Sequence, residues 1–389
     1  MKRTIEIGKS PSLNQIEAHE ASLAGYSGDI DVLMARDVSR NFFVESRLAS
    51  FIAGLSRRGA LTVADWGATS ISHKRKRFAD SPEGVASVLY GRSVTLNDRE
   101  RTPISTSDVL QRIIDGGGFG EGGADEVMRG NSHRSVSIYA FDDLDEKPFA
   151  LASTNVYSRF KDKFQKILFR YFEVGSGEGY RDRVGASLLD HLTRFVFEIY
   201  MNAYYHGRLS VSRDVIVPGM RYVRMKRYIA ANRTDLISGA TGFVELQQYL
   251  DAKFVNASNS MFCEISISDH GIGIPARFLS TCPWHSEQTM DSDFRCNLIN
   301  TIIAKSLSSN TNLAGAGNGL RNAIRDVDRL GGFLSIRTGD VWLFRDSRIT
   351  SSSSETDSLE TALIAVQSNQ KLLPICGTQV NMLLPMGRI

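Results

Sequence analysis

Residues 261–275 constrain the fold of this chain more than any other segment. Apolar side chains occupy alternate positions from Met261 to Ile267, which predicts a β-strand with one apolar face. Asp269 continues the apolar phase, so its carboxylate is predicted to face the core, where an unpaired charge is costly to bury. Gly271 and Gly273 follow and allow another molecule to approach the backbone closely. The run therefore predicts a strand that delivers a carboxylate into a glycine turn, although an ordinary Asp-X-Gly turn fits the same residues.

The overall composition bounds the class of protein. The chain has 389 residues, of which 42% are hydrophobic and 23% charged, and this is typical of a globular protein with two domains. A net charge of +3 does not indicate nucleic-acid binding, which stays possible but unsupported. Two basic runs, at residues 74–77 and 221–227, are interpreted as solvated surface, with phosphate or partner contact as the alternative.

The cysteines and the apolar runs bear on the compartment. The four cysteines lie singly, without CxxC spacing, which argues against a zinc site or a disulfide framework and fits a reducing cytosol. The first residues carry no apolar stretch behind their charges, and no run approaches the length that a membrane span needs. We therefore expect a cytoplasmic protein with no membrane association.

The first part of the chain predicts a small α/β domain. Strand-like residues 29–35, helical spacing over 43–55 and a second strand at 61–66 form a β-α-β unit. Residues up to about 26 are polar and are expected to be partly disordered. We accordingly predict an N-terminal α/β domain over residues 1–155, whose role the sequence does not indicate. Residues 156–184 are predicted to form a helical connector and linker.

Two further elements carry polar groups suited to a nucleotide. On the amphipathic helix predicted over residues 188–206, Glu198 and Asn202 lie four apart and share one face, where their oxygens can hold water and Mg²⁺. Gly315, Gly317 and Gly319 alternate just before Leu320 and another predicted helix, an arrangement whose backbone N–H groups suit phosphate oxygens. An exposed Glu and Asn, and a simple glycine cap, remain the plainer interpretations of each element alone. A GxxxxGK[ST] phosphate loop is absent from the sequence.

The order of these elements resembles the GHKL superfamily, the ATP-binding fold of DNA gyrase B, the ninety-kilodalton heat-shock chaperone, histidine kinases and MutL. Glu-xxx-Asn on a helix is followed by Asp-x-Gly-x-Gly after a strand, by Gly-x-Gly-x-Gly-Leu before a helix, and by Gly377-Thr378 entering a last strand. The resemblance covers about residues 185–386. It implies an α+β protein whose residues 185–389 form a Bergerat-type α/β sandwich, with an insertion at 207–260 and an ATP lid at 275–314.

The resemblance also assigns roles to individual residues. Asp269 would accept a hydrogen bond from the adenine amino group, Ile274 would line the base, and Thr378 would reach it through water. Asn202 would be the Mg²⁺ ligand, and Glu198 would orient the water that attacks the γ-phosphate. The remaining positions would form the glycine turns around the nucleotide: Gly271 and Gly273 at the base, then Gly315, Gly317, Gly319 and Leu320 at the phosphates.

Three functions are compatible with this resemblance. The first is an ATPase switch, in which Mg-ATP closes the lid of a homodimer and the change passes to the N-terminal domain or to an unidentified protein partner, in a regulatory, nucleic-acid-linked or phage-defence role. The second is a protein kinase of the histidine-kinase or anti-sigma type, although residues 156–172 contain no phosphoacceptor histidine. The third is a nucleotide-gated interaction module without turnover. Because no transducer domain follows residue 386, hydrolysis is expected to be slow or to draw its positive charge from another element.

Overall fold

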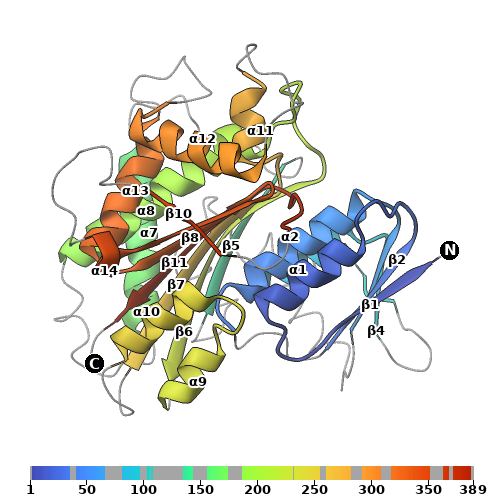
Figure 1. Ribbon diagram of the computed structural model, residues 1–389, viewed down its shortest axis with the longest axis horizontal. Coiled ribbons are helices and arrows are strands. Elements are labelled where there is room, and N and C mark those ends of the chain that lie inside the picture. Colours follow the sequence, from blue (N-terminus) through green and yellow to red (C-terminus); the bar gives the residue numbers. More distant parts are fainter. Residues whose placement is uncertain are drawn as a thin grey trace.

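A computed structural model describes residues 2–35, 41–65, 81–96, 103–105, 107, 135–142, 156–173, 186–230, 232–254, 260–281, 291–307, 317–350, 362–367 and 371–386. The fold is α+β and contains one parallel and one antiparallel sheet (Figure 1). No helix within these ranges is both long and apolar enough to cross a membrane. The glycine-rich residues 115–123 and the basic run 74–77 lie outside the described residues.

The smaller sheet is parallel and is built entirely from the first hundred residues. Its four strands follow one another in the order β1-β2-β3-β4. Their bounds are β1 Arg3–Ile7, β2 Ile30–Met34, β3 Leu61–Asp65 and β4 Ser93–Leu96, and the described helices between them are α1 Leu13–Ser22, α2 Val44–Ser56 and α4 Pro82–Tyr90. The β-α-β unit expected over residues 29–66 is confirmed, because β2 and β3 pair in parallel on either side of α2.

The expectation of partial disorder up to residue 26 was wrong. Ile5 and Ile7 are buried on β1, and α1 begins at a capping box in which the Ser12 side chain accepts from the Gln15 backbone and the Gln15 side chain accepts from the Ser12 backbone. A capping box fixes two otherwise unpaired N–H groups and so marks a helix start. Ser12 and Gln15, three residues apart, predict such a start, although the polar composition of the segment favoured disorder.

The larger sheet is antiparallel and has seven described strands in the order β10-β9-β8-β11-β7-β6-β5. The bounds are β5 Ser135–Asp142, β6 Gly219–Ala230, β7 Ser260–Asp269, β8 Phe333–Thr338, β9 Val341–Asp346, β10 Ile364–Ala365 and β11 Thr378–Pro385. Strand β7 is an interior strand that pairs with β6 on one side and with β11 on the other. The strand with one apolar face predicted around residues 261–267 is confirmed, and its Cys263, Ile265 and Ile267 are buried.

One face of this sheet is covered by helices that follow β5 in the sequence (Figure 1). They are α7 Val156–Glu173, α8 Ala186–Asn202 with its π-helical continuation η1 Ala203–Gly207, α11 Ile274–Leu279, α12 Ser292–Ala304, α13 Asn318–Arg329 and the short α14 Ser347–Thr350. Strand β5 pairs with β6, and α7 packs on α8. The boundary predicted at residue 155 therefore separates β5 from the sheet to which it belongs, and α7 is part of the helical layer rather than a connector.

The other face of the large sheet is covered by the N-terminal helices together with α9 Arg233–Ser238 and α10 Val244–Lys253. On α10, Tyr249 packs against Phe333 of β8, and the neighbouring Phe243 packs against Trp342 of β9. The same continuous core reaches α2 and the small parallel sheet. The described elements thus form four layers, in which one helical layer lies between the two sheets (Figure 1).

This shared layer is unusually polar where α2 meets β6. Arg224 is 5% exposed and donates to Glu45 of α2 at 2.9 Å, while Lys226 donates to the other oxygen of Glu45 at 2.8 Å. Arg221, 2% exposed, donates to Asp142 of β5 at 2.7 Å. The interpretation of residues 221–227 as solvated surface was therefore wrong. Acidic groups from distant segments make burial of these arginines possible, since a buried charge requires a hydrogen-bonded partner.

A second buried ion-pair group joins α1 and α2 to β8. The Glu17 carboxylate accepts from Arg47 at 2.7 Å and from Arg337 at 3.1 Å. Burial alone would raise the pKa of Glu17, but the two guanidinium groups hold it at about 2. Arg337 directly precedes Thr338, whose side chain lies next to the site described below.

Candidate functional site

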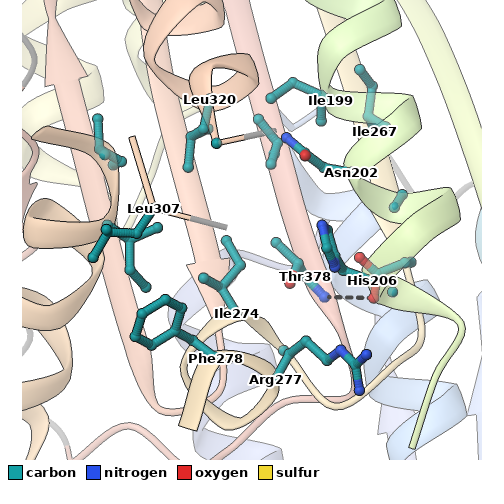
Figure 2. A pocket seen from close by; sticks show the side chains of 18 residues that line it. Ile199, Asn202, His206, Ile267, Ile274, Arg277, Phe278, Leu307, Leu320 and Thr378 are labelled. Carbon is teal, nitrogen blue, oxygen red and sulfur yellow. Dashed lines mark hydrogen bonds between the residues drawn. The ribbon is translucent and has the colours of Figure 1, made fainter. Parts of the chain in front are cut away.

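A single pocket contains most of the residues that the sequence singled out. It lies over the carboxyl end of β7, between α8 and η1 on one side and α11, α12 and the start of α13 on the other (Figure 2). Together with its open mouth it encloses about 900 Å³ of empty space. The predicted residues that line it are Asn202, Asp269, Gly273, Ile274, Gly317, Leu320 and Thr378.

The other predicted site residues are placed differently. Gly271, Gly319 and Glu198 are not among the described residues that line the pocket. Gly315 lies outside the described residues. The predicted lid, residues 275–314, contains most of α11 and all of α12; of these helices, Phe278, Ile302 and Ile303 line the pocket with aliphatic and aromatic surface.

Asp269 is the buried carboxylate at one end of the pocket. It is 5% exposed, and its Oδ1 accepts from the backbone N–H of Gly271 at 2.9 Å and from that of Thr378 at 3.3 Å; a dashed line marks the second bond in Figure 2. Burial raises the pKa of Asp269 to about 6, although the two N–H groups and Arg221 lower it. The β-pairing explains the position, because Asp269 lies opposite Arg221 on β6 and Thr378 on β11.

Three glycines allow the backbone to close around Asp269. A Cβ on Gly207 would lie 2.3 Å from the Asp269 Cγ, and a Cβ on Gly271 would lie 2.0 Å from the Gly207 carbonyl oxygen. Gly377 has φ +79°, and a Cβ there would lie 1.9 Å from the Asp269 carbonyl oxygen. The sequence reasoning missed Gly207 as a site residue because it took that position as the start of an insertion, although a glycine closing the Glu198 and Asn202 helix was a visible signal.

A second residue that was missed, Thr338, joins two predicted ones. Its hydroxyl oxygen accepts from the Ile274 backbone N–H at 2.8 Å and lies 3.0 Å from the Thr378 hydroxyl oxygen. Thr338 is fully buried at the end of β8, directly opposite Thr378 in the sheet. The contact therefore fixes the Thr378 hydroxyl and the start of α11 with respect to each other. No local sequence pattern around Thr338 distinguishes it from an ordinary threonine next to a glycine turn.

The other end of the pocket is formed by the meeting of α8 and α13. A Cβ on Gly319 would lie 2.7 Å from the Glu198 Oε2 and 3.4 Å from the Asn202 Nδ2, so the first turn of α13 packs directly on both side chains. Glu198 also hydrogen-bonds the Asn322 side chain, and burial raises its pKa despite that bond and nearby Arg194. The two helices thus bring together the predicted carboxylate, the predicted carboxamide and the predicted glycine.

The ionisable groups at the pocket are few. Arg277 is the only cationic side chain among the described lining residues; it is 6% exposed and donates to the Ser210 carbonyl at 3.2 Å. Burial, with a further contribution from Arg277, lowers the pKa of His206 to about 4, so this imidazole is neutral at physiological pH. Figure 2 shows His206 and Arg277 at the same end of the pocket as Thr378, with Asn202 and Leu320 at the other.

The described residues contain no group of three His, Cys, Asp or Glu side chains able to hold a metal ion. A Mg²⁺ ion at Asn202 would therefore depend on ligand oxygens and waters, which is its usual mode in nucleotide sites. Comparison of the chain with models of protein families, with the curated proteins and with the solved structures found no match.

Proposed function

We propose that the pocket binds Mg-ATP and that the protein is a GHKL-type ATPase that acts as a conformational switch. One observation carries this proposal: a buried carboxylate, Asp269, lies at one end of an apolar pocket, and Asn202 lies at the other end against the N-terminus of α13. The first group suits a base that offers an amino hydrogen, and the second suits phosphate and Mg²⁺.

The chain's own residues have distinct tasks in this function. Asp269 accepts the adenine amino hydrogen bond, Ile274 packs on the base, and Thr378 binds it through water. The backbone N–H groups in the first turn of α13, which follows Gly317, hold phosphate oxygens. Asn202 would hold Mg²⁺, which would supply positive charge to the phosphate oxygens. Glu198, with its raised pKa, takes a proton from the attacking water.

The adenine assignment predicts the effect of Asp269→Asn. The amide keeps the size of the side chain but presents N–H where one oxygen accepted, so ATP affinity is expected to fall at least about tenfold, as for loss of a hydrogen bond to a charged group. Calorimetric titration of ATP into wild type and variant measures this directly. Equal affinity in the two proteins would remove the basis of the proposal.

The fate of the γ-phosphate separates hydrolysis from the two alternative functions. With labelled ATP, an ATPase releases the label as free phosphate, whereas a kinase of the histidine-kinase or anti-sigma type transfers it to protein. Tight binding with neither outcome would support a nucleotide-gated module instead. We expect free phosphate, because Glu198 lies within the α8–α13 contact beside Asn202.

The raised pKa of Asp269 predicts a pH dependence of base binding. Below its pKa of about 6, this carboxyl gains a proton and loses an acceptor, so affinity is expected to be constant above pH 7 and to fall as the pH drops through 6. At pH 5 about one tenth of the groups remain ionised, which gives about tenfold weaker binding. Adenosine is the appropriate probe because it carries no titrating phosphate. Asp269→Asn is the control, and a wild-type profile as flat as that of the variant would contradict the assignment.

A further inference from the structure

The turn that follows Asp269 is bound from behind by the N-terminal α/β unit. At the end of α2, the Arg57 guanidinium donates to the His270 carbonyl at 2.5 Å and, more weakly, to the Gly271 carbonyl at 3.4 Å. At the end of α4, the Tyr90 hydroxyl lies 2.9 Å from His270 Nδ1, and the two rings pack with centroids 5.3 Å apart. Two helices that connect strands of the small parallel sheet thus end at the turn that follows Asp269.

The His270 ring is held in place by Tyr90 and is neutral. His270 is 2% exposed, and burial, together with nearby Arg57, lowers its pKa to about 3, so it is neutral and does not repel the guanidinium. The backbone of Met220 also hydrogen-bonds the Tyr90 hydroxyl. The Cys376 thiol donates to the His270 carbonyl at 3.2 Å from the opposite side. The backbone of the turn is therefore held by Arg57 and Cys376, and its His270 side chain is held by Tyr90.

A shift of this turn would reach the carboxylate directly. The Gly271 N–H that holds Asp269 Oδ1 lies in the same peptide chain as the two carbonyls that Arg57 binds. Gly207 and Gly377 pack so closely on the turn that neither would tolerate a Cβ, so the carboxylate cannot move independently of the backbone. Positions of groups that bind a ligand must hold to a fraction of an ångström for full affinity.

We propose that Arg57 and Tyr90 are positioning residues for Asp269, so that the N-terminal α/β unit sets the affinity of the pocket for the base. This inference rests on the proposed function, because it concerns the same site. Neither residue lines the pocket in the described part of the chain. By linkage, base binding must in turn favour the conformation in which α2 and α4 hold the turn, which makes this contact a physical connection between nucleotide and N-terminal unit.

The test uses two mild variants of the full chain. Arg57→Ala removes an exposed side chain, and Tyr90→Phe removes only a hydroxyl, so neither leaves a large cavity. Each is expected to raise the dissociation constant for Mg-ATP at least about fivefold, the effect of losing one hydrogen bond that orders a binding group. Mg-tripolyphosphate contacts only the phosphate end of the site. Its affinity, measured by displacement of ATP, is expected to be the same in both variants as in wild type.

The adjacent Arg58 provides the matched control, because its guanidinium donates to the Leu23 carbonyl at 2.8 Å rather than to the turn. Arg58→Ala is expected to bind both ligands as wild type does. The inference is overturned if Arg57→Ala and Tyr90→Phe keep wild-type ATP affinity, or if they lose ATP and tripolyphosphate affinity equally. If wild type binds no ATP, both proposals fail; if Asp269→Asn loses ATP and these two variants do not, only the inference fails.

Discussion

Replacement of Glu198 by glutamine is expected to lower the rate of ATP hydrolysis at least about 100-fold, within the range found when a general base is removed. ATP affinity is expected to stay within about threefold of wild type, because Glu198 acts on water in the transition state rather than on bound ATP. The physical reason lies in its surroundings, where burial raises the pKa of the carboxyl and so makes the ionised form a better proton acceptor. Phosphate release and calorimetric ATP binding measure the two quantities.

An acidic residue on the same helix supplies the control for Glu198→Gln. Asp190 lies on α8 two turns before Glu198, and its carboxylate accepts from Gln165 and pairs with Lys161 at the surface. Asp190→Asn makes the same carboxylate-to-amide change away from the pocket and is expected to leave turnover unchanged. Wild-type turnover in Glu198→Gln would remove this residue from the reaction, while equal losses in both variants would indicate a general effect on α8.

Replacement of Gly207 by alanine is expected to weaken ATP binding at least about tenfold, because the added methyl group must displace the carboxylate that receives the base. Its Cβ would lie 2.3 Å from the Asp269 Cγ, a distance that forces either the side chain or η1 to move. The same crowding is expected to lower the free energy of unfolding by about 1–3 kcal/mol. Calorimetric titration and denaturant unfolding measure the two effects.

Gly8→Ala is the matched control for Gly207→Ala. A Cβ on Gly8 meets no atom within 4 Å, so alanine there changes the chain without crowding it. Unchanged ATP affinity and stability are expected. If Gly207→Ala also binds ATP as wild type does, Asp269 has room to move, and the close approach of η1 does not shape the base site.

The parts of the site that follow from local patterns were predictable from the sequence. Alternation of apolar residues predicted the strand that ends at Asp269, since a period of two places Cys263, Ile265 and Ile267 on the same face of the sheet. Helical spacing likewise placed Glu198 and Asn202 on one face of α8. Gly317 and Gly319 marked the start of α13, since glycine permits the close contacts seen there.

The parts that depend on distant segments were not predictable in the same way. The burial of Arg224 requires Glu45, which lies 179 positions earlier, and no local pattern reports that pairing. The membership of β5 in the large sheet likewise follows from its hydrogen bonds to β6, across a long intervening stretch. Thr338 and Gly207 gained their significance only when β11 and β7 brought Thr378 and Asp269 beside them.

The helical layer shared by the two sheets limits how far the site can be treated as a transferable module. An excised segment starting at residue 185 would lack β5, α7 and the α1–α2 cover, and it would expose Arg224, Arg337 and Glu264 on a face that is now sealed. The pocket therefore cannot be separated from the N-terminal helices without exposing the sheet face that α1 and α2 cover. Chimaeras that keep the pocket must therefore carry α1 and α2 with it, and exchange of the N-terminal unit becomes a redesign of an interior.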